Sequence, residues 1–164
     1  SWNIGSEIIP KGTFKCNLPK INSNTKLEVG FFENTLEPFL KSTSKQNSNI
    51  KFLGQIQNTD LPAYYNSADI FCIPSQYEEG LGRVVMESVA CGTPVVGSNR
   101  GGISEALNAT VSILMEPTTE NLKKVIKMLY TDEGQLEALK IGCRDYAIKN
   151  YSKKNLELIT RHYV

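Results

Sequence analysis

The sequence lacks the features that mark several common classes of protein. No run approaches the roughly 18 apolar residues of a membrane span, and the first residues do not have the charged-then-apolar layout of a signal peptide. Basic and acidic side chains nearly balance, 18 against 17. The chain therefore has neither the basic surface of a nucleic-acid binder nor an acidic tail. We expect a soluble, cytoplasmic protein that does not bind nucleic acid.

Cysteines are few and widely spaced. The sequence has four of them, and no pair shows the spacing of a metal site or a redox motif. Two of the four lie inside apolar segments, so we expect reduced, buried thiols at Cys16, Cys72, Cys91 and Cys143. The sequence also has no Asp-x-Asp pair of the kind that holds a metal ion.

The length and the apolar content suit one domain. The chain has 164 residues, of which 40% are hydrophobic, and this is enough to bury a core. No internal repeat or low-complexity linker divides it. We expect a single domain over residues 1–164.

Short β-rich runs alternate with helical patterns along most of the chain. Period-two and apolar runs predict strands at residues 2–4, 26–29, 50–53, 69–73, 94–96 and 111–114. Helical spacing predicts helices at residues 15–24, 35–41, 61–66, 82–91 and 103–107, and three more at 119–130, 133–149 and 152–163. This alternation predicts an α/β fold with a Rossmann-like parallel sheet, helices on both faces and a helical C-terminal tail.

The stretch of residues 78–87 carries the clearest chemistry. Gly80 and Gly82 fall where a strand gives way to a helix, so bare backbone amides can approach an anion at the positive end of that helix. Glu79 lies in the loop before these amides, and Glu87 lies about two turns into the helix that Gly82 opens. The loop follows a strand, and open sheets bind ligands beyond the carboxyl ends of their strands. The layout suits a polyol diphosphate, with phosphate on the amides and hydroxyls on the carboxylates.

Four segments together form one pattern of a strand, a glycine loop with spaced glutamates, a return from helix to strand and a glycine-opened helix. They lie at residues 68–75, 79–82 with Glu87, 90–96 and 101–105. Together they resemble the C-terminal donor-binding domain of the retaining glycosyltransferases of family four, which have the two-domain GT-B fold. The resemblance covers nearly the whole chain. The part of the pattern at residues 68–105 is highly specific, because several glycines, two glutamates and a proline must all stand at fixed offsets.

The resemblance implies a donor substrate and roles for several residues. The donor is a nucleoside diphosphate sugar, bound without an obligatory metal or other cofactor. Glu79 then contacts hydroxyls of the donor sugar near the reacting carbon, and Glu87 accepts hydrogen bonds from the nucleotide ribose. The amides of Gly80, Leu81 and Gly82 lie against the diphosphate and the sugar.

The family also places an arginine and a lysine near the diphosphate, from the first strand-to-helix turn. That turn corresponds to residues 5–12 here, where Lys11 stands in the place of the lysine and Ser6 in the usual place of the arginine. Serine cannot replace a bidentate, permanently charged phosphate clamp. Arg83 is a candidate substitute by its proximity in sequence, and Arg100 is a weaker one.

The resemblance further implies transfer of a hexosyl group to a sugar or lipid-linked acceptor in polysaccharide or glycolipid biosynthesis. The acceptor is bound through an N-terminal domain that this sequence does not contain, so we expect the isolated domain to be inactive. The resemblance also implies peripheral membrane association of the parent enzyme.

Other interpretations stay open. The chain is alternatively a non-catalytic nucleotide- or sugar-binding module of the same fold, as Ser6 suggests. A receiver-like or flavodoxin-like domain shares the alternation but needs an acidic phosphoacceptor cluster or a flavin phosphate loop, and neither is visible. An epimerase or phosphorylase of the same fold is less favoured by the spaced glutamates. Tyr64 and Tyr65 are expected to pack their helix, with one ring at the edge of the base pocket as the alternative.

Overall fold

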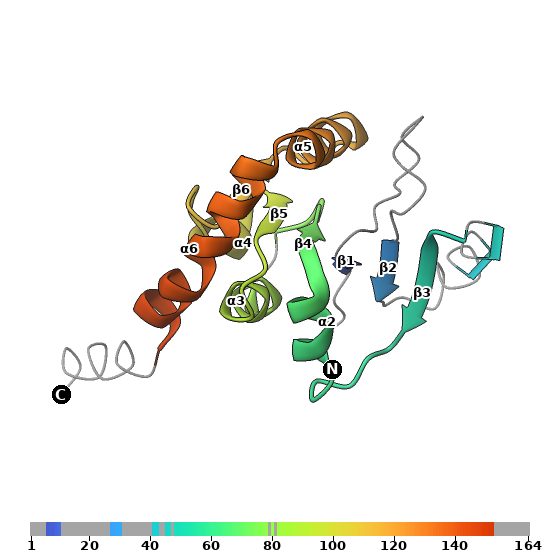
Figure 1. Cartoon of the computed structure of the whole chain (residues 1–164), viewed down its shortest axis with the longest axis horizontal. Helices are drawn as coiled ribbons and strands as arrows, with labels where there is room; N and C mark the ends of the chain where they lie inside the picture. The colour runs from blue at the N-terminus through green and yellow to red at the C-terminus, as the bar shows by residue number, and fades with distance from the viewer. Residues whose placement is uncertain are drawn as a thin grey trace.

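The computed structural model of the chain describes residues 6–10, 27–30, 41–42, 45–46, 48–78, 80 and 82–152. The described strands form one sheet, and most of the helices gather around one half of it (Figure 1). The strands are β1 (Ser6–Pro10), β2 (Leu27–Gly30), β3 (Ile50–Gly54), β4 (Ala68–Ile73), β5 (Val95–Ser98) and β6 (Ser112–Met115). The helices are α2 (Leu61–Ser67), α3 (Arg83–Ala90), α4 (Gly101–Ala106), α5 (Thr119–Thr131) and α6 (Glu133–Tyr151).

The sheet has the strand order β3-β2-β1-β4-β5-β6. Strands β2 and β3 are parallel, and so are the neighbours β4, β5 and β6. Strand β1 lies in the middle of the sheet and is antiparallel to both of its neighbours. The predicted α/β fold with a parallel sheet flanked by helices is therefore confirmed, with the direction of β1 as the exception.

The start of the chain differs from the prediction. Residues 2–4, where we predicted the first strand, lie outside the described residues, and we placed Ser6 in a strand-to-helix turn. That placement is wrong, because Ser6 is the first residue of β1. The run that follows it contains the β-branched pair Ile8 and Ile9, which favours extended backbone, and Ile8 pairs with residues of both β2 and β4.

The other elements lie close to their predicted positions where the structure describes them. Strands β2 to β6 begin and end within two residues of the predicted runs, and α2, α3, α5 and α6 match their predicted helices similarly well. Helix α4 begins at Gly101, two residues earlier than predicted. The helices predicted at residues 15–24, 35–41 and 152–163 fall wholly or almost wholly outside the described residues.

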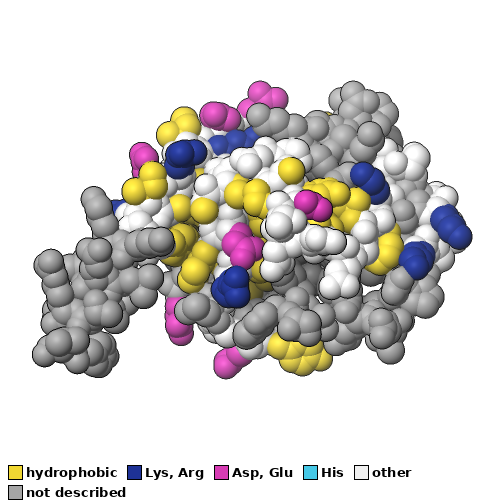
Figure 2. Space-filling view, turned by 90° about the horizontal axis from the view of Figure 1, so that it is seen from below, with side chains coloured by type: hydrophobic (Ala, Val, Ile, Leu, Met, Phe, Trp, Pro, Cys, Tyr) yellow, Lys and Arg dark blue, Asp and Glu magenta, His cyan; other side chains and the backbone are white. Residues whose placement is uncertain are grey.

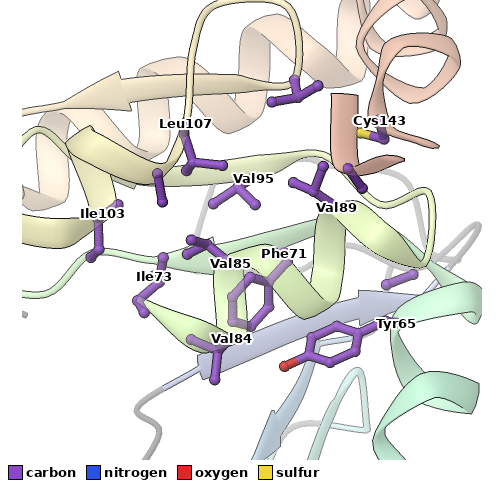
Figure 3. Close-up of a cluster of buried hydrophobic side chains, with 14 residues drawn as sticks. Tyr65, Phe71, Ile73, Val84, Val85, Val89, Val95, Ile103, Leu107 and Cys143 are labelled. Carbon is purple, nitrogen blue, oxygen red and sulfur yellow. The ribbon is translucent and has the colours of Figure 1, made fainter. Parts of the chain in front are cut away.

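Alternate residues of the central strands face opposite sides of the sheet. On β4, Phe71 and Ile73 pack in one cluster with residues of α2, α3 and α4, whereas Ile70 and Cys72 pack in a second cluster with residues of α5. Figure 3 shows the first cluster, in which Phe71 lies between α3 and the Tyr65 ring. Strand β4 is nearly continuous in apolar residues because helices cover both of its faces.

Helix α6 joins the two sides of the core. Leu139, near its start, belongs to the second cluster, and Cys143 and Ala147, one and two turns later, belong to the first. The Lys140 ammonium pairs with the Asp69 carboxylate at 2.8 Å, with both side chains largely buried. This ion pair attaches α6 to the start of β4, at the edge of the sheet opposite the carboxyl ends of the parallel strands.

The described cysteines are reduced. Cys72 and Cys143 are buried and Cys91 is half-buried, while Cys16 lies outside the described residues. Burial raises the pKa of the Cys143 thiol to about 12, so this group stays protonated. Within the described part of the chain, none of the helices combines the length and the apolar composition that a membrane span requires.

Candidate functional site

The parallel strands β4, β5 and β6 end at the same edge of the sheet, and three loops leave from there. The loop after β4 leads to α3, the loop after β5 leads to α4, and the loop after β6 leads to α5. Crevices at this edge are where open α/β sheets bind ligands. The predicted glycine motif lies in the first of these loops, as the sequence indicated.

Gly82 caps the start of α3 in a left-handed conformation, with φ 60° and ψ 38°. A Cβ atom at this position would lie 3.3 Å from Cγ2 of Val85 and 3.4 Å from the carbonyl oxygen of Gly102. The left-handed backbone therefore favours glycine, and a Cβ would also press on the Val85 side chain. The approach to Gly102 also places the glycine loop before α3 against the glycine pair that opens α4. Gly80, by contrast, faces open space, with no atom within 4 Å of a built Cβ among the described residues.

At the amino end of α3, some backbone N–H groups precede the first hydrogen bonds of the helix. The N–H groups of Val85 and Met86 donate to the carbonyl of Gly82 at 3.0 and 3.4 Å. The N–H groups of Arg83 and Val84 precede these bonds and have no partner inside the helix. No side chain among the described residues caps this end. Such a helix end attracts an anion through its free amides and its dipole.

Glu87 is the candidate ribose ligand on α3. Its position differs from the prediction, since five residues beyond Gly82 amount to a little over one turn rather than two. The side chain is 39% exposed and lies 3.8 Å from the Arg83 guanidinium, which is 64% exposed. Burial raises the pKa of Glu87 and the charge of Arg83 partly offsets that rise. The carboxylate is thus half-desolvated and loosely paired, so that a stronger partner can compete for it.

Arg100 makes contacts that its place before the glycine pair did not indicate. Its Nη1 donates to the carbonyl of Gln76 at 2.9 Å, and its Nη2 pairs with the carboxylate of Glu116. These contacts connect the loop after β4 with the loop after β6. Arg100 therefore braces two loops of the site, and this role gave no signal in the sequence because Gln76 and Glu116 are distant in the chain.

The structure describes the remaining predicted site residues only in part. Glu79, Leu81 and Lys11 lie outside the described residues, so their roles stay predictions. Ser6 begins β1 beside Gly30, the last residue of β2, and β1 is antiparallel to β2, so its backbone lies at the candidate edge. The other end of β1, Pro10, pairs with Ala68 at the opposite edge.

Tyr65, for which the sequence predicted packing with the edge of a base pocket as the alternative, also lies near Glu87. Tyr65 of α2 is 1% exposed. Burial raises the pKa of its phenol, and the charge of Glu87 raises it further, followed by that of Cys91. Burial and then the charge of Glu87 likewise raise the pKa of Cys91. The adjacent Tyr64 is only half-buried, so the packing role expected of the pair holds fully for Tyr65 alone.

The described surface carries no concentrated charge on the face shown in Figure 2, where acidic and basic side chains are scattered singly among other types. Among the described residues, no three His, Cys, Asp or Glu side chains gather in a group that could hold a metal ion.

The chain matches a known family over most of its length. Residues 33–146 match the family model described as "Glycosyl transferases group 1". This range includes both glycine loops, Glu87 and strands β3 to β6.

Two curated relatives share about one third of their aligned residues with the chain. A D-inositol 3-phosphate glycosyltransferase from Salinispora tropica is 34% identical over 105 residues, which cover 63% of this chain and 21% of that protein. A GDP-mannose-dependent monoacylated alpha-(1-6)-phosphatidylinositol monomannoside mannosyltransferase from Corynebacterium glutamicum is 33% identical over 130 residues, 75% of this chain and 33% of that protein. The chain thus spans a third or less of the length of these relatives.

The fold is shared with a solved structure. The Anabaena protein HepE, crystallised in complex with UDP-glucose, superposes with a TM-score of 0.74 at 20% identity, over 87% of this chain and 41% of that protein. At this identity the similarity concerns the fold.

Proposed function

This chain belongs to the group 1 glycosyl transferases, and we propose that it is a donor-binding domain for a nucleoside diphosphate sugar. In this proposal the sugar passes to an acceptor with retention of configuration and without a metal ion. The observation that carries the proposal is the geometry at the start of α3. A left-handed Gly82 packs against Gly102 and leaves free amides, and Glu87 lies one turn behind them.

The diphosphate binds at the amino end of α3. The amides of Arg83 and Val84 precede the helical ladder, and the helix dipole adds partial positive charge there. Departure of a nucleoside diphosphate builds negative charge on the same phosphates, so these donors stabilise the transition state as well. The amides of Gly80, Leu81 and Gly82 complete this anion site.

The ribose binds at Glu87. A half-buried carboxylate paired loosely at 3.8 Å can accept hydrogen bonds from two vicinal hydroxyls. Each such charge-assisted bond is worth roughly 1.5–3 kcal/mol. Glu87 lies too far along the helix to share the amides, which separates the ribose from the diphosphate as a nucleotide requires.

The transferred sugar and its leaving group contact the loop residues. We assign Glu79 to the sugar hydroxyls and Lys11 to the diphosphate. Arg83, at the mouth of the anion site and 64% exposed, supplies the guanidinium that Ser6 lacks. These cations and the helix end together replace a metal in neutralising the leaving group.

The names of similar proteins support the class of donor. HepE was crystallised with UDP-glucose, and the Corynebacterium relative is named as dependent on GDP-mannose. Both donors are nucleoside diphosphate hexoses that differ in the base and the sugar. The donor of this chain belongs to the same class.

The acceptor, a sugar or a lipid-linked molecule, binds through a further domain of the parent enzyme. The chain spans only a third or less of its curated relatives, so we propose that this domain alone binds the donor but does not transfer it. We further propose a cytoplasmic parent enzyme that associates peripherally with a membrane.

Titration calorimetry of the chain with UDP, GDP and ADP, and with UDP-glucose and GDP-mannose, tests the donor site. The proposal predicts saturable binding of one nucleotide and its sugar conjugate, unchanged by EDTA. Absence of binding for all of them would contradict a donor site in this domain.

The alternative is a binding module without chemistry, and Ser6 is the observation that favours it. Ser6 begins β1 at the candidate edge, so an arginine there starts close to the anion site. If the site is a weakened enzyme site, Ser6→Arg strengthens binding of the nucleoside diphosphate several-fold relative to the nucleoside monophosphate. Equal binding by Ser6→Arg and the wild type favours the module.

A further inference from the structure

A buried tyrosine ring packs in the core beside α3, the helix that carries Glu87, and is held on several sides. The Tyr65 ring packs edge-to-face on Phe71, with ring centroids 5.4 Å apart. It belongs to the same buried cluster as Val84 and Val85 of α3, and the Tyr65 backbone carbonyl accepts a hydrogen bond from the Thr93 hydroxyl. In Figure 3 the phenol oxygen is directed toward Val84, on the first turn of α3. The position of the hydroxyl is thus set by the core.

The Tyr65 hydroxyl has no hydrogen-bond partner among the described residues, although it is fully buried. Buried polar groups are nearly always paired, because an unpaired one loses its bonds to water without replacement. Phenylalanine would fill the same apolar space without this loss. The hydroxyl therefore does not serve the stability of the free fold, and its presence calls for a partner that turns toward it when ligand binds.

Glu87 is the group placed to be that partner. It follows Val84 by three residues on α3, so the two side chains project from neighbouring positions on the same side of the helix. Burial raises the pKa of the Tyr65 phenol most, and the negative charge of Glu87 raises it further. The phenol stays protonated and remains a donor. The present partner of Glu87, Arg83, is distant at 3.8 Å and mostly exposed, so this pair is weak.

We propose that Tyr65 is a positioning residue for Glu87 in the nucleotide-bound state. One carboxylate oxygen of Glu87 accepts a hydrogen bond from the Tyr65 hydroxyl, and the other faces the ribose hydroxyls. The inference rests on the proposed ribose role of Glu87 and deepens it. When Glu87 turns from Arg83 toward Tyr65, it also releases the Arg83 guanidinium. Arg83 is the first residue of α3, so its guanidinium can then face the diphosphate. Ribose and diphosphate recognition are coupled in this way through one side chain.

The test compares Tyr65→Phe with Tyr64→Phe as the matched control, because Tyr64 is the neighbouring, half-buried tyrosine of the same helix. Titration calorimetry uses the nucleoside diphosphate that the wild type binds, and melting is followed without ligand. Tyr65→Phe is expected to weaken binding by about tenfold or more, the loss of one hydrogen bond to a charged group. The melting temperature of ligand-free Tyr65→Phe stays equal or rises, since an unpaired buried group is removed. Tyr64→Phe binds like the wild type.

Two further measurements show whether Tyr65 acts through Glu87. In a Glu87→Gln background, adding Tyr65→Phe is expected to weaken binding by no more than about twofold, because the two changes break the same arrangement. With the 2′,3′-dideoxy form of the nucleotide, the wild type and Tyr65→Phe are expected to bind equally, since the ribose hydroxyls are gone.

The outcomes separate the inference from the proposed function. Wild-type affinity of Tyr65→Phe together with a large loss in Glu87→Gln would overturn the role of Tyr65 and leave the ribose site standing. Wild-type affinity of Glu87→Gln would overturn the ribose site, and the inference with it. A lowered melting temperature of Tyr65→Phe with unchanged affinity would show that the hydroxyl is merely structural.

Discussion

Gly82 lies against Gly102, so that a Cβ atom on Gly82 would come within 3.4 Å of the Gly102 carbonyl oxygen. This contact places the start of α3, with the amides of the proposed anion site, against the start of α4. It connects two glycine motifs that are 20 residues apart in the sequence.

Replacing Gly82 by alanine is expected to lower both stability and nucleotide binding. Alanine in a left-handed conformation costs roughly 1–2 kcal/mol, and the added methyl group presses on Gly102 and Val85. We expect urea unfolding to show a loss of this size and calorimetry to show a larger loss of affinity. Gly80→Ala is the control, because its Cβ meets no described atom within 4 Å. Equal stability of Gly82→Ala and the wild type would contradict the account.

Arg100 is expected to act as a brace rather than as a phosphate ligand. Its contacts to Gln76 and Glu116 are largely exposed, so Arg100→Ala changes the free energy of unfolding by no more than about 1 kcal/mol. Nucleotide affinity falls several-fold because the loop after β4 loses its attachment. Glu116→Ala, which removes the Arg100 contact on the loop after β6 without removing a positive charge, is expected to weaken binding similarly. If only Arg100→Ala weakened binding, Arg100 would be a phosphate ligand and the brace would be the wrong explanation.

Nucleotide binding is expected to weaken on acidification through the raised pKa of Glu87. Burial raises this pKa and Arg83 only partly opposes the rise, so Glu87 takes up its proton at a higher pH than an ordinary glutamate. Binding needs the ionised form, and affinity therefore falls as pH drops through that pKa. Glu87→Gln removes this pH dependence, and calorimetry between pH 4 and 8 measures it.

The raised pKa of Glu87 affects the stability of the fold with the opposite pH dependence. A carboxyl group whose pKa is raised by folding stabilises the fold at low pH, and this contribution is lost as pH rises through the folded pKa. Glu87→Gln is therefore expected to gain melting temperature relative to the wild type as pH increases. A constant difference in melting temperature across the pH range would show that the folded pKa of Glu87 is not raised.

The ion pair of Lys140 with Asp69 is expected to contribute to stability and not to binding. The two side chains are 17% and 20% exposed and lie at the edge opposite the site. Lys140→Met leaves Asp69 partly buried without this partner, which costs roughly 1–3 kcal/mol. Urea unfolding measures this loss, and calorimetry should show unchanged nucleotide affinity. Lys124→Met, an exposed lysine of α5, is the control.

The fold and the candidate anion site follow from local patterns that the sequence shows directly. The apolar runs of strands β3 to β6 and the capping residues of the helices that follow are local signals. The glycines at positions 80 and 82 likewise indicate the strand-to-helix turn. Strand β1 was misplaced because its extended run lies among glycines and prolines that also suit a turn. Its antiparallel pairing depends on partners that are distant in sequence.

The remaining features of the site depend on tertiary contacts. Arg100 bridges two loops, and Tyr65 brings an unpaired hydroxyl toward α3 from another helix. In the sequence, Arg100 is an arginine before a glycine pair and Tyr65 is half of a tyrosine pair. Only packing distinguishes the buried Tyr65 from its half-buried neighbour.

The central claim is that Glu87 holds the ribose of a nucleoside diphosphate bound at the start of α3. Titration calorimetry of Glu87→Ala, beside Glu137→Ala as a control at an exposed glutamate of α6, tests it most directly. Glu87→Ala is expected to bind the nucleotide about tenfold to a hundredfold more weakly than the wild type, while Glu137→Ala binds it unchanged. Saturable wild-type binding that Glu87→Ala retains in full would contradict the account.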